Sequence, residues 1–150
     1  MAACEKRMPR AFAKIQAGKA DAMYNAKIVR AQTLQSAEKA IRAIGVSEDC
    51  VRIMREKAVF RLIKLRGVRN AVANILKQEM LSCGGDATVS QWTVNCSRPK
   101  TDVLLMGTAK QLSRVIVKMR MQSQGLAPGK KSEYKAIAEE LSSVLKKSLG

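Results

Sequence analysis

The sequence of 150 residues contains no histidine, and this absence limits the chemistry that the chain can perform by itself. A histidine-based catalytic mechanism is excluded from within the chain. The four cysteines (Cys4, Cys50, Cys83 and Cys96) form no Cys-x-x-Cys pair. Structural zinc sites use closely spaced thiolates or imidazoles. The sequence therefore predicts no metal site and no bound cofactor, and its cysteines favour a reducing, cytoplasmic compartment.

Aromatic residues are also scarce, at 3% of the sequence. No apolar run reaches the roughly 18 residues that a membrane span needs, and no apolar stretch near the start is typical of a signal peptide. Hydrophobic residues make up 47% of the chain, which is ordinary for a globular protein. We therefore expect a globular protein without a membrane partner, whose core consists of aliphatic side chains and methionine.

Positive charge is what the chain has in excess, with a net charge of +16. Residues 27–122 alone contain 18 basic and 7 acidic residues, so a charged tail does not explain the excess. Seven basic residues fall between positions 52 and 69 with Glu56 as the single acid. They are Arg52, Arg55, Lys57, Arg61, Lys64, Arg66 and Arg69. This basic cluster indicates either a site for a polyanion such as nucleic acid or an ordinary solvated face.

Short apolar runs separated by turn residues predict four strands. They cover residues 27–31, 58–65, 86–89 and 102–106. The last is apolar enough to be central in a sheet, and residues 92–96 either continue the third strand or pair with it. In the second strand, alternation places Val59, Ile63 and Leu65 on one face and Phe60 and Leu62 on the other. We expect both faces to be partly covered.

Apolar residues at helical spacing predict four helices. They cover the segment from an N-cap at Ser36 to Gly45, and residues 68–82, 109–121 and 133–147. Thr108 is the expected N-cap of the third, and residues 47–49 are expected to form a turn. Gly84 and Gly85 follow a helix, which is the order of a helix C-cap rather than of a phosphate-binding loop. Gly107 follows a strand and precedes a helix, which is the order of an anion-binding corner. A single glycine is a weak signal for such a site, however, and favours an ordinary strand-to-helix corner.

The order of these elements predicts a single small α+β domain with a mixed β-sheet. We assign residues 27–126 to this domain, residues 1–26 to a basic extension, and residues 127–150 to a linker and a terminal amphipathic helix. Ile137, Leu141 and Val144 align along that helix. We expect this apolar stripe to belong to any surface that binds a partner domain.

Several segments of the predicted domain also form recognisable motifs. They are residues 58–65 (AVFRLIKL), 74–82 (NILKQEMLS), 84–87 (GGDA) and 101–108 (TDVLLMGT), followed by Lys110-Gln111-Leu112. Together they resemble the N-terminal extension that precedes the catalytic barrel in some bacterial dihydropteroate synthases. The resemblance covers residues 28–126.

That family makes dihydropteroate from a pterin diphosphate and para-aminobenzoate in a (β/α)8 barrel. The pterin- and phosphate-binding signatures of the barrel are absent from this sequence, so the resemblance implies folate biosynthesis as the context and assigns no catalytic residue. The implied partner is a dihydropteroate synthase barrel domain, in the same chain or in another one. The polar residues that we consider as ligand contacts are Asn74, Lys77, Gln78 and Asn95.

Two functional hypotheses therefore remain open. In the first, the chain is a non-catalytic accessory domain of a dihydropteroate synthase, and the motifs favour it. In the second, it is a free-standing basic module that binds RNA or another polyanion, and the net charge alone favours it.

Overall fold

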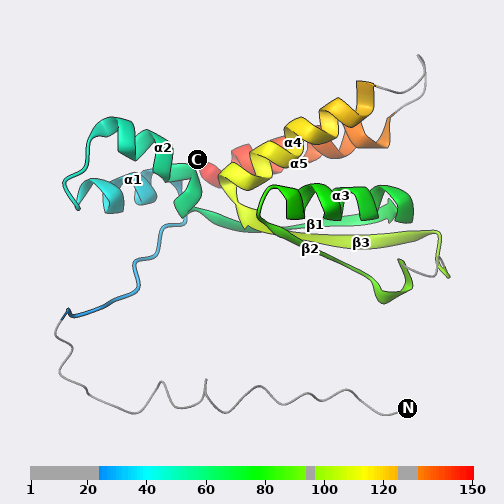
Figure 1. Ribbon diagram of the computed structural model, residues 1–150, viewed down its shortest axis with the longest axis horizontal. Helices are drawn as coiled ribbons and strands as arrows, with labels where there is room; N and C mark the ends of the chain where they lie inside the picture. Colours follow the sequence, from blue (N-terminus) through cyan, green and yellow to red (C-terminus); the bar gives the residue numbers. More distant parts are fainter. Residues whose placement is uncertain (1–23, 94–96, 125–131) are drawn as a thin grey trace, which may run out of the picture.

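The computed structural model describes residues 24–93, 97–124 and 132–150, in which helices cover one side of a three-stranded sheet (Figure 1). The helices are α1 (Leu34–Arg42), α2 (Glu48–Ala58), α3 (Asn70–Ser82), the 3₁₀ turn η1 (Gln91–Thr93), α4 (Ala109–Gln124) and α5 (Glu133–Leu149). The strands are β1 (Phe60–Arg69), β2 (Asp86–Val89) and β3 (Lys100–Thr108). The predicted α+β class is confirmed.

The sheet is antiparallel, not mixed, with strand order β1-β3-β2. Alternating strands and helices usually place parallel strands side by side, which is why the sequence favoured a mixed sheet. Here β1 and β2, which precede and follow α3 in the sequence, run in the same direction. They are not neighbours in the sheet, because β3 lies between them and pairs antiparallel with both. The predicted central position of this most apolar strand is confirmed.

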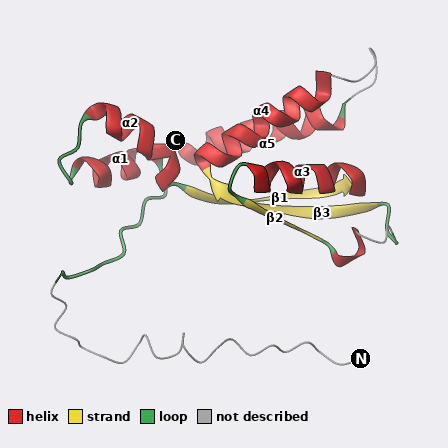
Figure 2. Cartoon of the chain, viewed as in Figure 1, coloured by secondary structure: helices red, strands yellow, loops and turns green. Residues whose placement is uncertain are grey.

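One face of the sheet carries the hydrophobic core. Side chains of Ile63, Leu65, Val103 and Leu105 are buried on this face, against α3, α4 and α5. Figure 2 shows these three helices on the same side of the sheet, with none on the other side. The sequence predicts that the strand 58–65 is partly covered on both faces. This prediction is wrong, because the helices form a single layer on one side of the sheet.

The corner between β3 and α4 is held by a reciprocal pair of hydrogen bonds. The backbone N–H of Gln111 donates to Oγ1 of Thr108 (3.3 Å), and the backbone N–H of Thr108 donates to Oε1 of Gln111 (2.8 Å). This confirms Thr108 as the helix cap. The predicted C-cap after α3 is also confirmed, since Gly84 adopts φ +82° directly after the last helical turn.

The sequence-based prediction failed mainly before β1. Residues 27–31 are mostly exposed and pair with no strand of the sheet, so they do not form the predicted strand. Thr33, not Ser36, caps α1, and Ser36 bonds back from the third helical position. Residues 47–49 do not form a separate turn: Ser47 caps α2, whose first turn contains Glu48 and Asp49. Acidic residues favour the positive end of the helix dipole.

β1 begins and ends later than predicted, because Ala58 is the last residue of α2 and the strand continues to Arg69. Its pairing with β3 shifts between Leu65 and Val68, at a bulge that contains Gly67. Gly67 has φ +65°, which favours glycine, and its N–H donates to Asp102 (3.1 Å). Residues 91–93 form η1 instead of a strand. Residues 94–96, most of the basic extension and the linker 125–131 lie outside the described residues.

The terminal helix α5 contributes to the core. Ile137 and Leu141 are buried, whereas Val144 is 43% exposed. The stripe that we expected to bind a partner domain is therefore mostly covered within this chain by its own elements. Among the described helices, none is long and apolar enough to cross a membrane.

Candidate functional site

The basic cluster 52–69 is divided between two elements of the fold. Its first three members lie on α2 and its last four on β1. Five of the seven contact other groups of the chain. Arg52 pairs with Asp49, Arg55 with Glu38, Lys64 with Asp102 and Arg69 with Glu133, while Arg61 donates to the carbonyl oxygen of Ser148. In the described part of the chain, Lys57 and Arg66 form no ion pair. Binding of a polyanion by this cluster stays a prediction.

The candidate polar contacts are only partly brought together. Asn74 and Gln78 are exposed and four residues apart on α3, and Lys77 is half-buried beside them. Asn95 lies outside the described residues. No ligand role is tested for any of the four, so their role stays a prediction.

Ion pairs between helices keep several carboxyl groups charged. Lys118 of α4 donates to Glu79 of α3 (2.7 Å), and this hydrogen bond holds the pKa of Glu79 below its ordinary value of 4.5. It also raises the pKa of Lys118 above 10.5. Both shifts favour the charged forms. The pair therefore stabilises the folded chain at neutral pH, and this contribution is lost as the pH falls through the lowered pKa of Glu79.

The uncovered face of the sheet is apolar at its centre. Phe60 and Leu62 are 53% and 61% exposed, and Leu104 and Met106 on β3 are half-buried. Leu62 lies directly opposite Met106, and Leu104 lies between Lys64 and Thr88 of the two outer strands. A solvated sheet face usually alternates polar residues outward. A contiguous apolar patch on such a face is typical of an interaction surface.

A second feature is a hollow of about 340 Å³ at the end of the sheet where α4 begins. It is lined by Lys57, Cys83, Thr108, Lys110, Gln111 and Arg114. The sequence pattern indicates the Gly107-Thr108 corner but does not point to the two basic side chains after it, Lys110 and Arg114. The available signal was the four-residue spacing of Lys110 and Arg114, which places both on one side of the first turns of α4.

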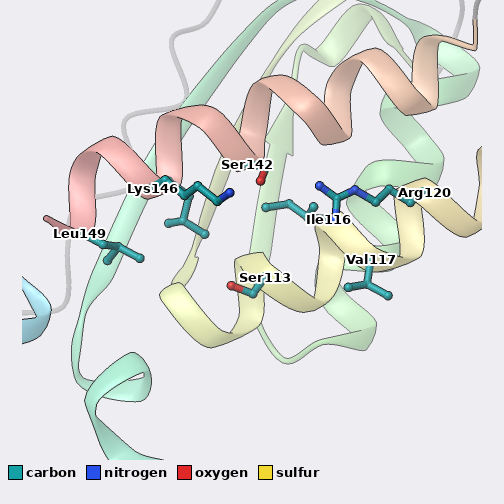
Figure 3. Close-up of a pocket in the computed structure, with 8 residues that line it drawn as sticks. Ser113, Ile116, Val117, Arg120, Ser142, Lys146 and Leu149 are labelled. Carbon is teal, nitrogen blue, oxygen red and sulfur yellow. The ribbon is translucent and has the colours of Figure 1, made fainter. Parts of the chain in front are cut away.

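A groove between α4 and α5 forms a third hollow, of about 250 Å³ (Figure 3). Arg120 of α4 and Lys146 of α5 extend into it, over an apolar floor that includes Ile116. No group of three histidine, cysteine or acidic residues that could hold a metal ion occurs in the parts that the structure describes.

Comparison with known proteins places these features in context. The chain is 32% identical over 119 residues to a bifunctional dihydropteroate synthase/dihydropteroate reductase of Helicobacter pylori, which covers 79% of this chain and 29% of that protein. It is 35% identical over 95 residues to a probable bifunctional folylpolyglutamate synthase/dihydropteroate synthase of Halobacterium salinarum, which covers 63% of this chain and 11% of that protein. This chain is similar to part of dihydropteroate synthase proteins.

The predicted resemblance to dihydropteroate synthase proteins is thereby confirmed at the level of weak homology over part of the chain. The chain spans less than a third of the length of either dihydropteroate synthase relative. No protein-family model and no solved structure matches it.

Proposed function

We propose that this chain is an accessory domain of a dihydropteroate synthase protein, with no synthase activity by itself. The observation that carries the proposal is that two matched proteins, whose other named activities differ, both include dihydropteroate synthase in their names. This supports a segment that accompanies the synthase rather than one particular second enzyme.

The lengths are consistent with this role. Because 119 matched residues make up 29% of the Helicobacter pylori protein, about 290 of its residues lie outside the match. A (β/α)8 barrel takes about 250 residues. The unmatched part can hold one complete barrel, so the matched segment is not needed to build it.

The uncovered sheet face is the surface that we assign to the synthase domain. Its apolar centre consists of the exposed Phe60 and Leu62 and the half-buried Leu104 and Met106. A net charge of +16 disfavours contact between two copies of the chain. Covalent linkage, as in the relatives, raises the effective concentration of the two domains and allows a small interface to suffice.

The test uses the Helicobacter pylori protein from which the matched segment has been removed, after retained synthase turnover has shown that the remainder is folded. We expect the chain to bind this protein in calorimetry, and Leu62→Glu to weaken binding about tenfold or more, because a carboxylate would be buried without a partner. Val117→Glu is the matched control, since Val117 is 50% exposed on α4 and lies in the helical layer. It is expected to leave binding unchanged.

Two further arms separate this proposal from the polyanion hypothesis. The intact Helicobacter pylori protein should not bind the chain, because its own matched segment occupies the site. Apolar docking should change little with salt, whereas contacts to about six phosphates of duplex DNA give a log–log slope near −5. RNA binding that persists at about 0.3 M salt, without affinity for the synthase part, would contradict the accessory role.

A second candidate function is a contribution to dihydropteroate reduction, the other activity in the name of the Helicobacter pylori protein. The observation that favours it is the same length argument, since one barrel nearly fills the unmatched residues. Reduction needs a hydride donor such as a nicotinamide or a flavin. In this role the chain would supply one wall of a site that the synthase domain completes.

Removing the matched segment from the Helicobacter pylori protein tests this second function. Synthase turnover should change by less than about twofold, and reductase turnover should fall about 100-fold or more because the positioning groups are lost. Reductase activity that survives the deletion would assign it to the barrel part.

A further inference from the structure

We propose that the hollow beside the start of α4 binds a phosphorylated small molecule, with a diphosphate as the group that it fits best. The inference rests on the chemistry of the hollow and does not depend on the accessory role.

Three elements that are separate in sequence form this site. Lys57 comes from the last turn of α2, Cys83 follows α3, and Lys110 and Arg114 lie on the first turns of α4. Figure 1 shows the ends of these helices meeting at one end of the sheet. The hollow of about 340 Å³ therefore collects its cations through the tertiary fold.

The charge of the three cations in this hollow is not offset by a carboxylate among the described residues. Arg55, two residues before Lys57, is by contrast paired with Glu38. In the described residues, Lys57, Lys110 and Arg114 form no ion pair. Like charges that share one hollow repel each other, and a bound anion would relieve this repulsion through charge-assisted hydrogen bonds.

Other groups of the hollow add donors for an anion. The Gln111 side chain accepts the Thr108 N–H through Oε1 (2.8 Å), which leaves its amide N–H groups for a ligand. Arg114 has the planar fork that matches two phosphoryl oxygens. The hollow also lies at the N-terminal end of a 16-residue helix, whose dipole favours negative charge there.

Charge matching selects the ligand class. A phosphate monoester carries about −1.5 to −2 charges at neutral pH, which three cations exceed. A diphosphate brings more negative charge and more acceptor oxygens into the same space. A nucleic-acid strand instead needs an extended basic track with aromatic side chains for base stacking. None of the residues that line this hollow is aromatic.

The experiment titrates the full 150-residue chain with inorganic pyrophosphate at about 0.1 M salt, using calorimetry and backbone amide NMR shifts. We expect a Kd on the order of 0.1–1 mM and shifts that concentrate at residues 57, 83 and 108–114. Lys110→Ala and Arg114→Ala should each weaken binding about fivefold to tenfold. Arg114→Lys keeps the charge but removes the planar guanidinium. On a logarithmic scale, it should weaken binding by about half as much as Arg114→Ala.

The charge-matched control is Lys135→Ala. Lys135 is exposed near the start of α5, and Figure 1 places that helix end away from the start of α4. It should change the affinity less than about twofold. Three results would overturn the proposal: no binding of pyrophosphate, an equal loss in Lys135→Ala, or RNA binding that Arg114→Ala weakens while pyrophosphate binding is unaffected. Circular dichroism of each variant verifies that it is folded.

Discussion

Replacing Leu141 by alanine is expected to destabilise the folded chain by about 2–5 kcal/mol, because the side chain is only 1% exposed and its removal leaves a cavity. For a chain of 150 residues this corresponds to a decrease in Tm of roughly 2–4 °C per kcal/mol. Urea denaturation of purified variants measures the effect. The expectation follows from the position of α5 in the common core, against α4.

Val144→Ala on the same helix is the control. Val144 is 43% exposed, so its truncation should cost less than about 1 kcal/mol. A Leu141→Ala variant as stable as the unmodified chain would mean that α5 can detach from the core. The apolar stripe of Ile137, Leu141 and Val144 would then be available to bind a partner domain.

Gly107→Ala is expected to destabilise the chain by about 1–3 kcal/mol through overpacking. A methyl group at this position would lie 2.3 Å from Cε of Met80 and 3.2 Å from Oε1 of Gln111. Met80 is fully buried, and its Cε also lies 2.2 Å from the place that a side chain at Gly85 would take. The terminal methyl group of Met80 therefore occupies space that Gly85 and Gly107 leave open. Because Met80 is fully buried, this methyl group has little room to move.

A double-mutant cycle with Met80→Leu tests this cause. Leucine lacks the terminal methyl group of methionine, and the exchange alone should cost less than about 1.5 kcal/mol. In its presence Gly107→Ala should cost at least about 0.5 kcal/mol less than in the unmodified chain. Strictly additive free energies of unfolding would show that contact with Met80 is not the source of the strain.

Local signals explain which elements could be predicted. β3 and α4 have strong patterns: an apolar run, then the cap Thr108, then the buried stripe that includes Leu112 and Met119. α2 was missed because its apolar side chains do not form one buried stripe. Val51 is buried, but Ile53 and Met54 remain 57% and 43% exposed among basic residues. The run at 27–31 was misread because a strand needs a hydrogen-bonded neighbour, which local sequence does not reveal.

The candidate sites show the same division. The basic cluster was visible as composition, but the ion pairs of Arg55 with Glu38 and of Arg69 with Glu133 join positions 17 and 64 residues apart. Lys57 and Arg114 meet at one hollow for the same reason. No periodicity within a single segment encodes such pairs.

The sequence by itself determined the α+β class, the apolar faces of β1, β3 and the later helices, the cap at the start of α4, the cap at the end of α3 and the similarity to dihydropteroate synthase proteins. These features depend on residues close together in the chain, whose spacing fixes hydrogen bonding and side-chain direction. Only the tertiary structure decided that β3 pairs antiparallel with both β1 and β2, that all the covering helices lie on one face, and that Phe60 and Leu62 stay exposed. Such choices depend on contacts between distant segments, because burial is gained only when whole apolar faces meet.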